Sequence, residues 1–114
     1  MPKFKRTAFK PWESKKDDGF EKRFIRIGST QLASEPMRTL SASAFKILIY
    51  MKIEAGGRKE FTFSNVKYRA FMSKPTFFKV LDELVEKGFI DIKERNKNQR
   101  ISNVYLFSER WKDL

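Results

Sequence analysis

The sequence has no cysteine and no histidine among its 114 residues. The first absence excludes disulfide bonds and thiol nucleophiles, and the two together exclude the Cys/His sites that hold structural zinc. The second absence removes the side chain that most often transfers protons near neutral pH. A chain without cysteine also suits the reducing interior of a cell, so we expect a cytoplasmic protein.

Long apolar segments and glycine-rich motifs are missing as well. No apolar run has the length of a membrane span, and the N-terminus, MPKFKRTAFK, lacks the apolar centre of a signal peptide. No glycine pattern of a phosphate-binding or dinucleotide-binding loop is present. The carboxylate pair Asp17-Asp18 lies in a charged stretch where nothing would fix a metal or an acid–base site. We therefore expect no membrane partner, no cofactor, no metal and no enzymatic activity.

Positive charge, in contrast, is abundant and unevenly placed. The 25 Lys/Arg residues exceed the 14 Asp/Glu residues and give a net charge of +11. Residues 58–81 carry six basic residues and one acidic one, whereas Asp82, Glu83 and Glu86 then reverse the sign. A basic start and an acidic end oppose the dipole preference of a helix, so local stability does not explain this order. Binding of a polyanion, above all a nucleic acid, explains it better than a lopsided solvated face.

The chain divides into two parts by its apolar pattern. Residues 1–22 show no apolar period and predict a flexible basic tail, whose scattered aromatic residues offer contacts to a protein partner. Residues 23–114 form the predicted domain. It begins with the alternating stretch 23–27, which fits a short strand or an extended lead-in. A short helix over 31–40 follows, with Leu32 and Met37 expected to face inward.

Capping residues predict the boundaries of the next elements. Ser41 is the expected N-cap of a long helix that Gly56-Gly57 ends, and Phe45, Leu48 and Ile49 are expected in the core. Apolar residues lie all round this helix, so we expect it to be buried on most sides. Residues 61–63 predict a strand, and residues 65–70 predict a short helix capped at position 64.

The most informative stretch runs from Phe71 to Phe107. Ser73 is the expected N-cap of a helix that Gly88 ends in a left-handed conformation, with Phe77, Leu81 and Leu84 as its core stripe. A strand from position 89, a turn-rich loop over 96–100 and a return strand over 101–107 follow. Broken alternation at 102–103 predicts a bulge in the return strand. Trp111 is expected to lock the last segment onto the core.

The run from Ser73 to Ile90 resembles a known family. It reads SKPTFFKVLDELVEKGFI and is similar to the S-x-x-T-h-x-x-x-L-x-x-L-x-x-x-G-h-I pattern of winged helix-turn-helix proteins, where h is apolar. The nearest groups are small regulators and replication initiators of plasmids, phages and integrative elements. The resemblance covers about residues 40–107. It implies an α+β, mainly α, winged-helix fold in which three helices form the core and a small antiparallel sheet forms the β-wing.

The same resemblance implies a function. It predicts sequence-specific binding of double-stranded DNA by a transcriptional regulator, or by a replication or transfer accessory protein of a mobile element. The long flanking helices of the dimeric antibiotic-resistance regulators are lacking, so a homodimer is expected only on DNA. Two alternatives stay open. One is a winged-helix module that binds a protein partner through Phe78 and the tail, and the other is a single-stranded nucleic-acid binder.

The candidate DNA contacts fall into three groups. Helical spacing turns one group away from the core stripe, and these recognition-helix candidates are Ser73, Lys74, Thr76, Phe78 and Lys79. The wing candidates are Arg95, Lys97, Asn98, Gln99 and Arg100, and the backbone candidates are Lys67 and Arg69. The alternative role of Ser73 is to cap the helix, and the alternative for the lysines is exposure to solvent without any contact to DNA. Phe78 would either touch thymine methyl groups or pack under the wing or the tail.

Overall fold

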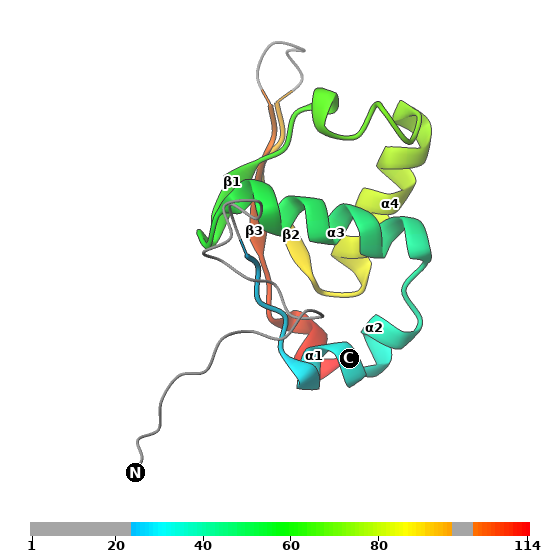
Figure 1. The fold of residues 1–114 in the computed structure, drawn as a ribbon, viewed down its shortest axis with the longest axis vertical. Helices are drawn as coiled ribbons and strands as arrows, with labels where there is room; N and C mark the ends of the chain where they lie inside the picture. The colour runs from blue at the N-terminus through cyan, green and yellow to red at the C-terminus, as the bar shows by residue number, and fades with distance from the viewer. Residues whose placement is uncertain (1–23, 97–101) are drawn as a thin grey trace, which may run out of the picture.

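The computed structural model describes residues 24–96 and 102–114 and confirms an α+β fold. The predicted tail lies outside these residues, as do Lys97, Asn98, Gln99 and Arg100. The described part contains four α-helices, a three-stranded sheet and two short 3-10 helices (Figure 1). In chain order they are α1 Ser29–Ala33, α2 Glu35–Arg38, α3 Ala42–Ala55, β1 Glu60–Thr62, η2 Asn65–Lys67, α4 Lys74–Glu86, β2 Ile90–Glu94, β3 Val104–Phe107 and η3 Arg110–Asp113.

The sheet is antiparallel and has the strand order β1-β3-β2. β3 is therefore the central strand, and Tyr105 pairs with Phe61 on one side and with Ile92 on the other. The predicted bulge at 102–103 is on the wrong strand, because the register shifts between Ile92 and Glu94 on β2. The extra residue there, Lys93, forms an ion pair with Glu60 of β1 at 2.7 Å. The alternation of apolar and polar residues in the sequence does not predict this ion pair.

The core lies between the sheet and the helices α3 and α4. Leu48, Leu81, Leu84 and Phe77 are buried, as predicted. Burial of a side chain of this size contributes roughly 1.5–3 kcal/mol to stability. Phe77 also stacks on Tyr68, with ring centroids 4.0 Å apart and planes inclined by 3°. The largest fully buried side chains are Phe89, Ile47, Leu48, Met51, Leu81, Leu84 and Ile90.

α3 is buried along one face rather than on most sides. Its buried positions are Ala44, Ile47, Leu48, Met51 and Ala55, which repeat with helical spacing. The predicted burial of Phe45 is wrong, because 36% of this residue is exposed. Tyr50 and Ile53 are exposed as well, and Ile49 is only half-buried. The apolar band is wider than the face that α4 and the sheet cover.

The helix ends confirm the predicted caps Ser41 and Ser73, whereas the predicted cap at Ser64 is wrong, because its side chain makes no capping hydrogen bond. The Ser41 hydroxyl accepts a hydrogen bond from the amide of Ala44 at 3.1 Å. Ser73 does the same for Thr76 at 3.3 Å. Gly88, just beyond α4, has φ 84, which an L-residue rarely adopts. Local side-chain chemistry therefore sets where α3 and α4 begin and where α4 ends.

The segment before α3 differs from the prediction. The expected single helix over 31–40 is divided at Ser34, which accepts a hydrogen bond from the amide of Met37 and so caps a second helix, α2. Leu32 is 43% exposed, so its predicted inward orientation is wrong, whereas Met37 is buried. Residues 24–28 do not join the sheet, so the lead-in is not a strand. The predicted helix over 65–70 is the shorter η2 followed by a turn.

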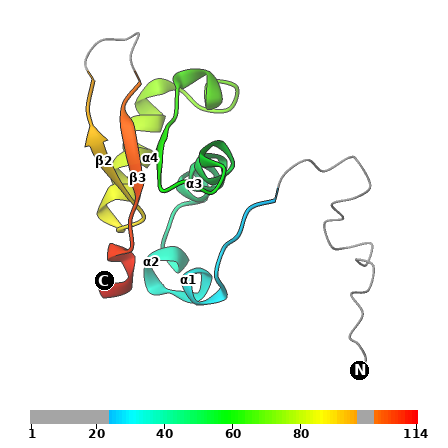
Figure 2. The same cartoon turned by 90° about the vertical axis from the view of Figure 1, so that its left-hand side faces the viewer.

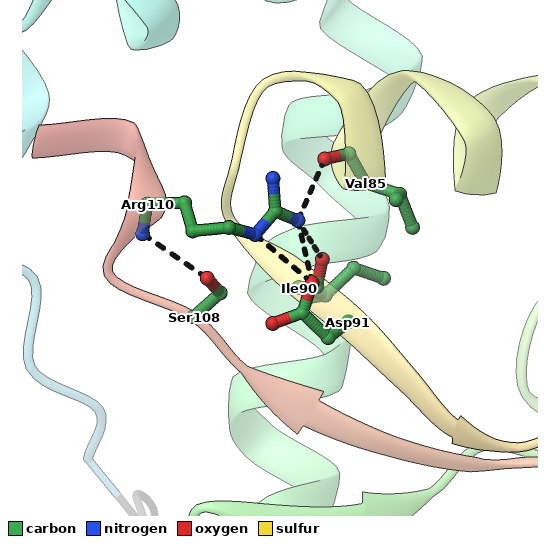
Figure 3. A network of polar contacts seen from close by, with 5 residues as sticks. All are labelled: Val85, Ile90, Asp91, Ser108 and Arg110. Atoms are coloured by element: carbon green, nitrogen blue, oxygen red, sulfur yellow. Dashed lines mark hydrogen bonds and ion pairs between the residues drawn. The ribbon is translucent and has the colours of Figure 1, made fainter. Parts of the chain in front are cut away.

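The C-terminal residues dock on the end of α4. The amide of Trp111 donates to the Gly88 carbonyl at 3.1 Å, and its ring lies 6.3 Å from that of Phe89. Figure 3 shows how Arg110 completes this junction. Its Nη2 donates to the carbonyls of Val85 at 2.9 Å and of Ile90 at 3.1 Å, and its guanidinium pairs with Asp91. The predicted lock at Trp111 is confirmed, and Arg110 in addition donates to a carbonyl of the last turn of α4.

Candidate nucleic-acid interface

Two consecutive parts of the chain and the more distant β2–β3 hairpin meet at one end of the molecule. They are η2 with the turn after it, the first two turns of α4, and the ends of β2 and β3 next to the hairpin loop (Figures 1 and 2). We call this region the hairpin end. The fold brings the segments together because α4 runs away from this end and β2 returns to it. Its exposed basic residues include Lys67, Arg69, Lys74, Lys79 and Arg95.

The first turn of α4 is shaped by Ser73 and Thr76. The Ser73 hydroxyl accepts from the Thr76 amide and donates to the Thr76 hydroxyl at 3.0 Å. The predicted capping role of Ser73 is therefore confirmed. Ser73 could donate a hydrogen bond to an outside acceptor only if this local bond to Thr76 opened. Thr76 is exposed, and its hydroxyl proton points to no acceptor among the described residues.

Phe78 lies on the exposed face of the same helix. It is 47% exposed, and its described ring neighbours are Phe77 at 6.1 Å and the Lys74 ammonium, which lies 5.8 Å from the ring centroid. Lys79 follows on the exposed side and makes no ion pair within residues 24–96 and 102–114. The helix thus presents an aromatic ring between two ammonium groups. That combination can meet both phosphate oxygens and apolar base edges.

The two backbone candidates differ in their surroundings. Lys67 forms an ion pair with Glu54 of α3 at 3.1 Å, with 46% and 35% of the two side chains exposed. Arg69 is exposed in the turn after η2. Exposed ion pairs contribute at most about 1 kcal/mol, so an incoming phosphate could compete for Lys67. The sequence offered no sign of this pair, because the partners lie on different elements.

Asparagine side chains close the base of the hairpin loop. The amide of Asn96 donates to Oδ1 of Asn103 at 2.6 Å, and Nδ2 of Asn96 donates to the Ser102 carbonyl at 2.8 Å. Nδ2 of Asn103 donates to the Tyr105 hydroxyl at 3.4 Å. Burial raises the pKa of Tyr105, and the hydrogen bond from Asn103 opposes part of that rise. The network fixes the strand ends, and the exposed Arg95 follows β2 beside it.

The acidic half of α4 is directed to the opposite part of the fold. The Glu83 carboxylate accepts hydrogen bonds from the amide and the hydroxyl of Ser41, both at 2.7 Å. Lys87, just after α4, donates to the Thr39 hydroxyl at 2.7 Å. These contacts tie the end of α4 to the segment before α3. The change of sign along the helix can be predicted from the sequence, whereas the contact of Glu83 with Ser41 cannot, because the two residues lie on different elements.

The hairpin end has the chemistry of a binding surface. Among the described residues, no group of three acidic side chains is placed as a metal site would need. None of the helices in this part of the chain is long and apolar enough to cross a membrane. The exposed side chains at the hairpin end include ammonium and guanidinium groups, hydroxyls, the ring of Phe78, the apolar Val66 and the carboxylate of Glu94. They can form charge-assisted hydrogen bonds and apolar contacts with an anionic surface.

Comparisons of the chain with protein-family models, with curated proteins and with solved structures find no match. The geometry of the described residues is therefore the basis for a functional proposal.

Proposed function

We propose that this chain is a winged-helix protein that binds duplex DNA. In this proposal the first half of α4 enters the major groove, and the β2–β3 hairpin contacts an adjacent stretch of backbone. One observation carries it. Lys74, Phe78 and Lys79 are exposed on the first turns of α4, at the same end of the molecule as Arg95 on the hairpin.

The dimensions of α4 support the proposal. The helix has 13 residues, which corresponds to a length of roughly 20 Å. An α-helix with its side chains is about 10–12 Å wide, and the major groove is about 12 Å wide. Lysine side chains at the groove edge reach phosphate oxygens or guanine, while a phenylalanine ring suits a thymine methyl group.

The distribution of charge supports the same orientation. Cations occupy the exposed face of the first half of α4, whereas Glu83 in the second half is engaged with Ser41. Repulsion between the carboxylates of α4 and phosphates is therefore smaller at the start of the helix than at its end. A role as a transcriptional regulator, or as a replication or transfer accessory protein of a mobile element, rests on the family resemblance of residues 40–107. A second copy on DNA would extend the contacted site.

The test is a fluorescence-anisotropy titration of a mixed duplex pool at several salt concentrations. The variant Lys74→Ala/Lys79→Ala should bind more weakly, and the slope of log K against log salt should shrink by roughly 1.8, because two phosphate contacts are lost. Lys59→Ala/Lys112→Ala is the matched control, since it removes the same charge outside the hairpin end. Equal losses in both variants, or no duplex binding at low salt, would overturn the proposal.

A second candidate is binding of a single strand, favoured by one cluster where α3 packs on the turn after η2. Tyr50 stacks on Phe71 with centroids 5.1 Å apart, and the Lys46 ammonium lies 4.4 Å from the centroid of the same ring. Exposed aromatic rings beside cations are typical of surfaces that stack unpaired bases. The same titration with a single-stranded pool decides between the two, because tighter binding of the single strand would favour this second candidate.

A further inference from the structure

A basic groove lies on a different side of the molecule from the hairpin end. Residues 24–26, the last turn of α3, the turn that follows it and Phe107 of β3 line this groove, which has a volume of about 360 Å³. In Figure 2, α3 lies between α4 and the segment that begins at Phe24. Three cations line the groove, Arg26, Lys52 and Arg58, and no acidic side chain does.

The positive charge of this groove is not balanced within the described part of the chain. Arg26, Lys52 and Arg58 form no ion pair with any residue in 24–96 or 102–114. Acidic side chains on the neighbouring elements are committed to other cations. These pairs are Glu54 with Lys67, Glu60 with Lys93, Asp91 with Arg110 and Glu109 with Lys112. The described residues therefore supply no ion-pair partner for these three cations.

Lys52 is the most informative of the three. It is half-buried, its ammonium lies 5.1 Å from the centroid of the Phe107 ring, and burial lowers its pKa. Withdrawing an ammonium group from water without an anionic partner is unfavourable. A carboxylate that entered the groove would supply the missing partner, and it would do so where solvent screening is weaker than at an open surface.

We propose that this groove binds an acidic peptide segment of a partner protein. Carboxylates of the segment would face Lys52, Arg26 and Arg58, and an apolar side chain of the segment would rest on Phe24, which is 43% exposed. The two guanidinium groups suit carboxylates because each can donate two parallel hydrogen bonds. Cations beside an exposed aromatic ring match a peptide that carries both acidic and apolar side chains.

The groove fits a peptide better than a nucleic acid. The phosphate backbone of a duplex has no apolar group to place against Phe24, and a duplex is too wide to enter the groove. A single strand stacks successive bases on several ring faces, and of the two aromatic rings that line the groove only that of Phe24 is open. The ring of Phe107 is already in use, because Phe61 stacks on it at 4.6 Å and Lys52 lies over it. Since α3 separates the groove from α4, a partner bound here would leave the hairpin end accessible, and the proposal stands independently of DNA binding.

The test measures binding of a fluorescein-labelled peptide of alternating Glu and Leu to the full chain. A peptide of roughly eight residues would span about 26 Å when extended. Its counterpart with Gln in place of Glu reports the contribution of the carboxylates. Lys52→Met and Arg58→Met should each weaken binding of the acidic peptide by roughly tenfold. Lys46→Met is the matched control, because Lys46 also lies on α3 with its ammonium over an aromatic ring, 4.4 Å from the Phe71 centroid.

Each outcome decides the proposal. Selective loss in Lys52→Met and Arg58→Met, with Lys46→Met unchanged and the Gln peptide bound weakly by all, would support it. Equal losses in all three variants, or no binding of the acidic peptide by the unmodified chain, would overturn it. A single-stranded oligonucleotide of equal charge that bound more tightly, and lost affinity in Lys52→Met, would overturn it in favour of a nucleic-acid groove. Lys74→Ala/Lys79→Ala should bind the peptide normally, which separates this test from that of the hairpin end.

Discussion

Glu83 of α4 holds the first residue before α3, because its two carboxylate oxygens accept the amide and the hydroxyl of Ser41 at 2.7 Å. Ser41 in turn caps Ala44, so a single chain of hydrogen bonds joins the side of α4 to the start of α3. The bond from Lys87 to Thr39 lies next to it. These contacts fix how α4 crosses α3, and thereby how the exposed face of α4 is presented.

Replacement of Glu83 should weaken this junction. We expect Glu83→Ala to lower the free energy of unfolding by roughly 1 kcal/mol, because both Ser41 donors would lose a charged acceptor at an exposed site. Glu86→Ala is the matched control, since Glu86 lies exposed on the same helix without such a bond. Urea unfolding of the two variants measures the difference. Equal stabilities would show that the Glu83–Ser41 contact contributes nothing.

Substitution of the two glycines with the largest positive φ distinguishes the cost of backbone strain from the cost of a steric clash. A Cβ at Gly57, φ 89, would meet nothing within 4 Å, whereas a Cβ at Gly88, φ 84, would lie 2.5 Å from the Trp111 nitrogen. Gly57→Ala should therefore cost only the strain, roughly 1 kcal/mol. Gly88→Ala should cost roughly 3 kcal/mol, because η3 must also move away. Thermal unfolding measures both losses of stability. Equal losses would show that the contact between the added Cβ and Trp111 costs nothing.

Tyr105 should make the fold sensitive to alkaline pH. Burial raises the pKa of its hydroxyl above the ordinary value of 10.0. Above pH 10 the unfolded chain loses this proton while the folded chain keeps it, so the free energy of unfolding should fall as pH rises through and beyond 10. Tyr105→Phe should reduce that fall. Part of it should remain, because burial also raises the pKa of Tyr68.

Urea titrations at pH 9 and at higher pH measure the effect. Tyr50→Phe serves as the control, because Tyr50 is 38% exposed on the outer face of α3. A pH dependence that is the same in Tyr105→Phe and in the unmodified chain would contradict the prediction.

Phe77 and Phe78 are adjacent but should respond differently to truncation. Phe77 is 3% exposed and stacks on Tyr68, so Phe77→Ala should destabilise the fold by roughly 3–5 kcal/mol. Phe78 is 47% exposed, so Phe78→Ala should change stability by less than about 1 kcal/mol. Under the proposed function, Phe78→Ala should nonetheless weaken duplex binding. Normal duplex affinity in a stable Phe78→Ala protein would remove this ring from the interface.

Local signals in the sequence were sufficient for several elements. Ser41 and Ser73 were identified as caps because a hydroxyl before a helix satisfies amides within the next turn. Gly88 was identified as a helix end because left-handed backbone favours glycine. The stripe that includes Phe77 and Leu81 is buried because helical spacing places these side chains on one face. In each case the determining residues lie within a few positions of one another.

The remaining features depend on contacts between distant residues. Phe45 was misplaced because apolar residues surround α3, and only packing decides which of its faces is covered. The bulge is on β2 because strand pairing sets the register, which alternation in a single strand does not define. Partners such as Glu54 for Lys67 lie on different elements. For the candidate site, spacing placed Lys74, Phe78 and Lys79 on an exposed face, whereas the groove cations became neighbours only in the folded chain.

The separation of charge along α4 affects how the molecule is oriented as it approaches a polyanion, before the two touch. Lys74 and Lys79 are exposed near its start, whereas Asp82 and Glu86 are exposed beyond them. The partial positive charge at a helix N-terminus adds to this asymmetry. In the field of a polyanion, these opposite charges produce a torque that turns the start of α4 towards the polyanion while the molecule is still diffusing. At low ionic strength this rotation would raise the fraction of encounters that are already correctly oriented, and added salt would abolish it.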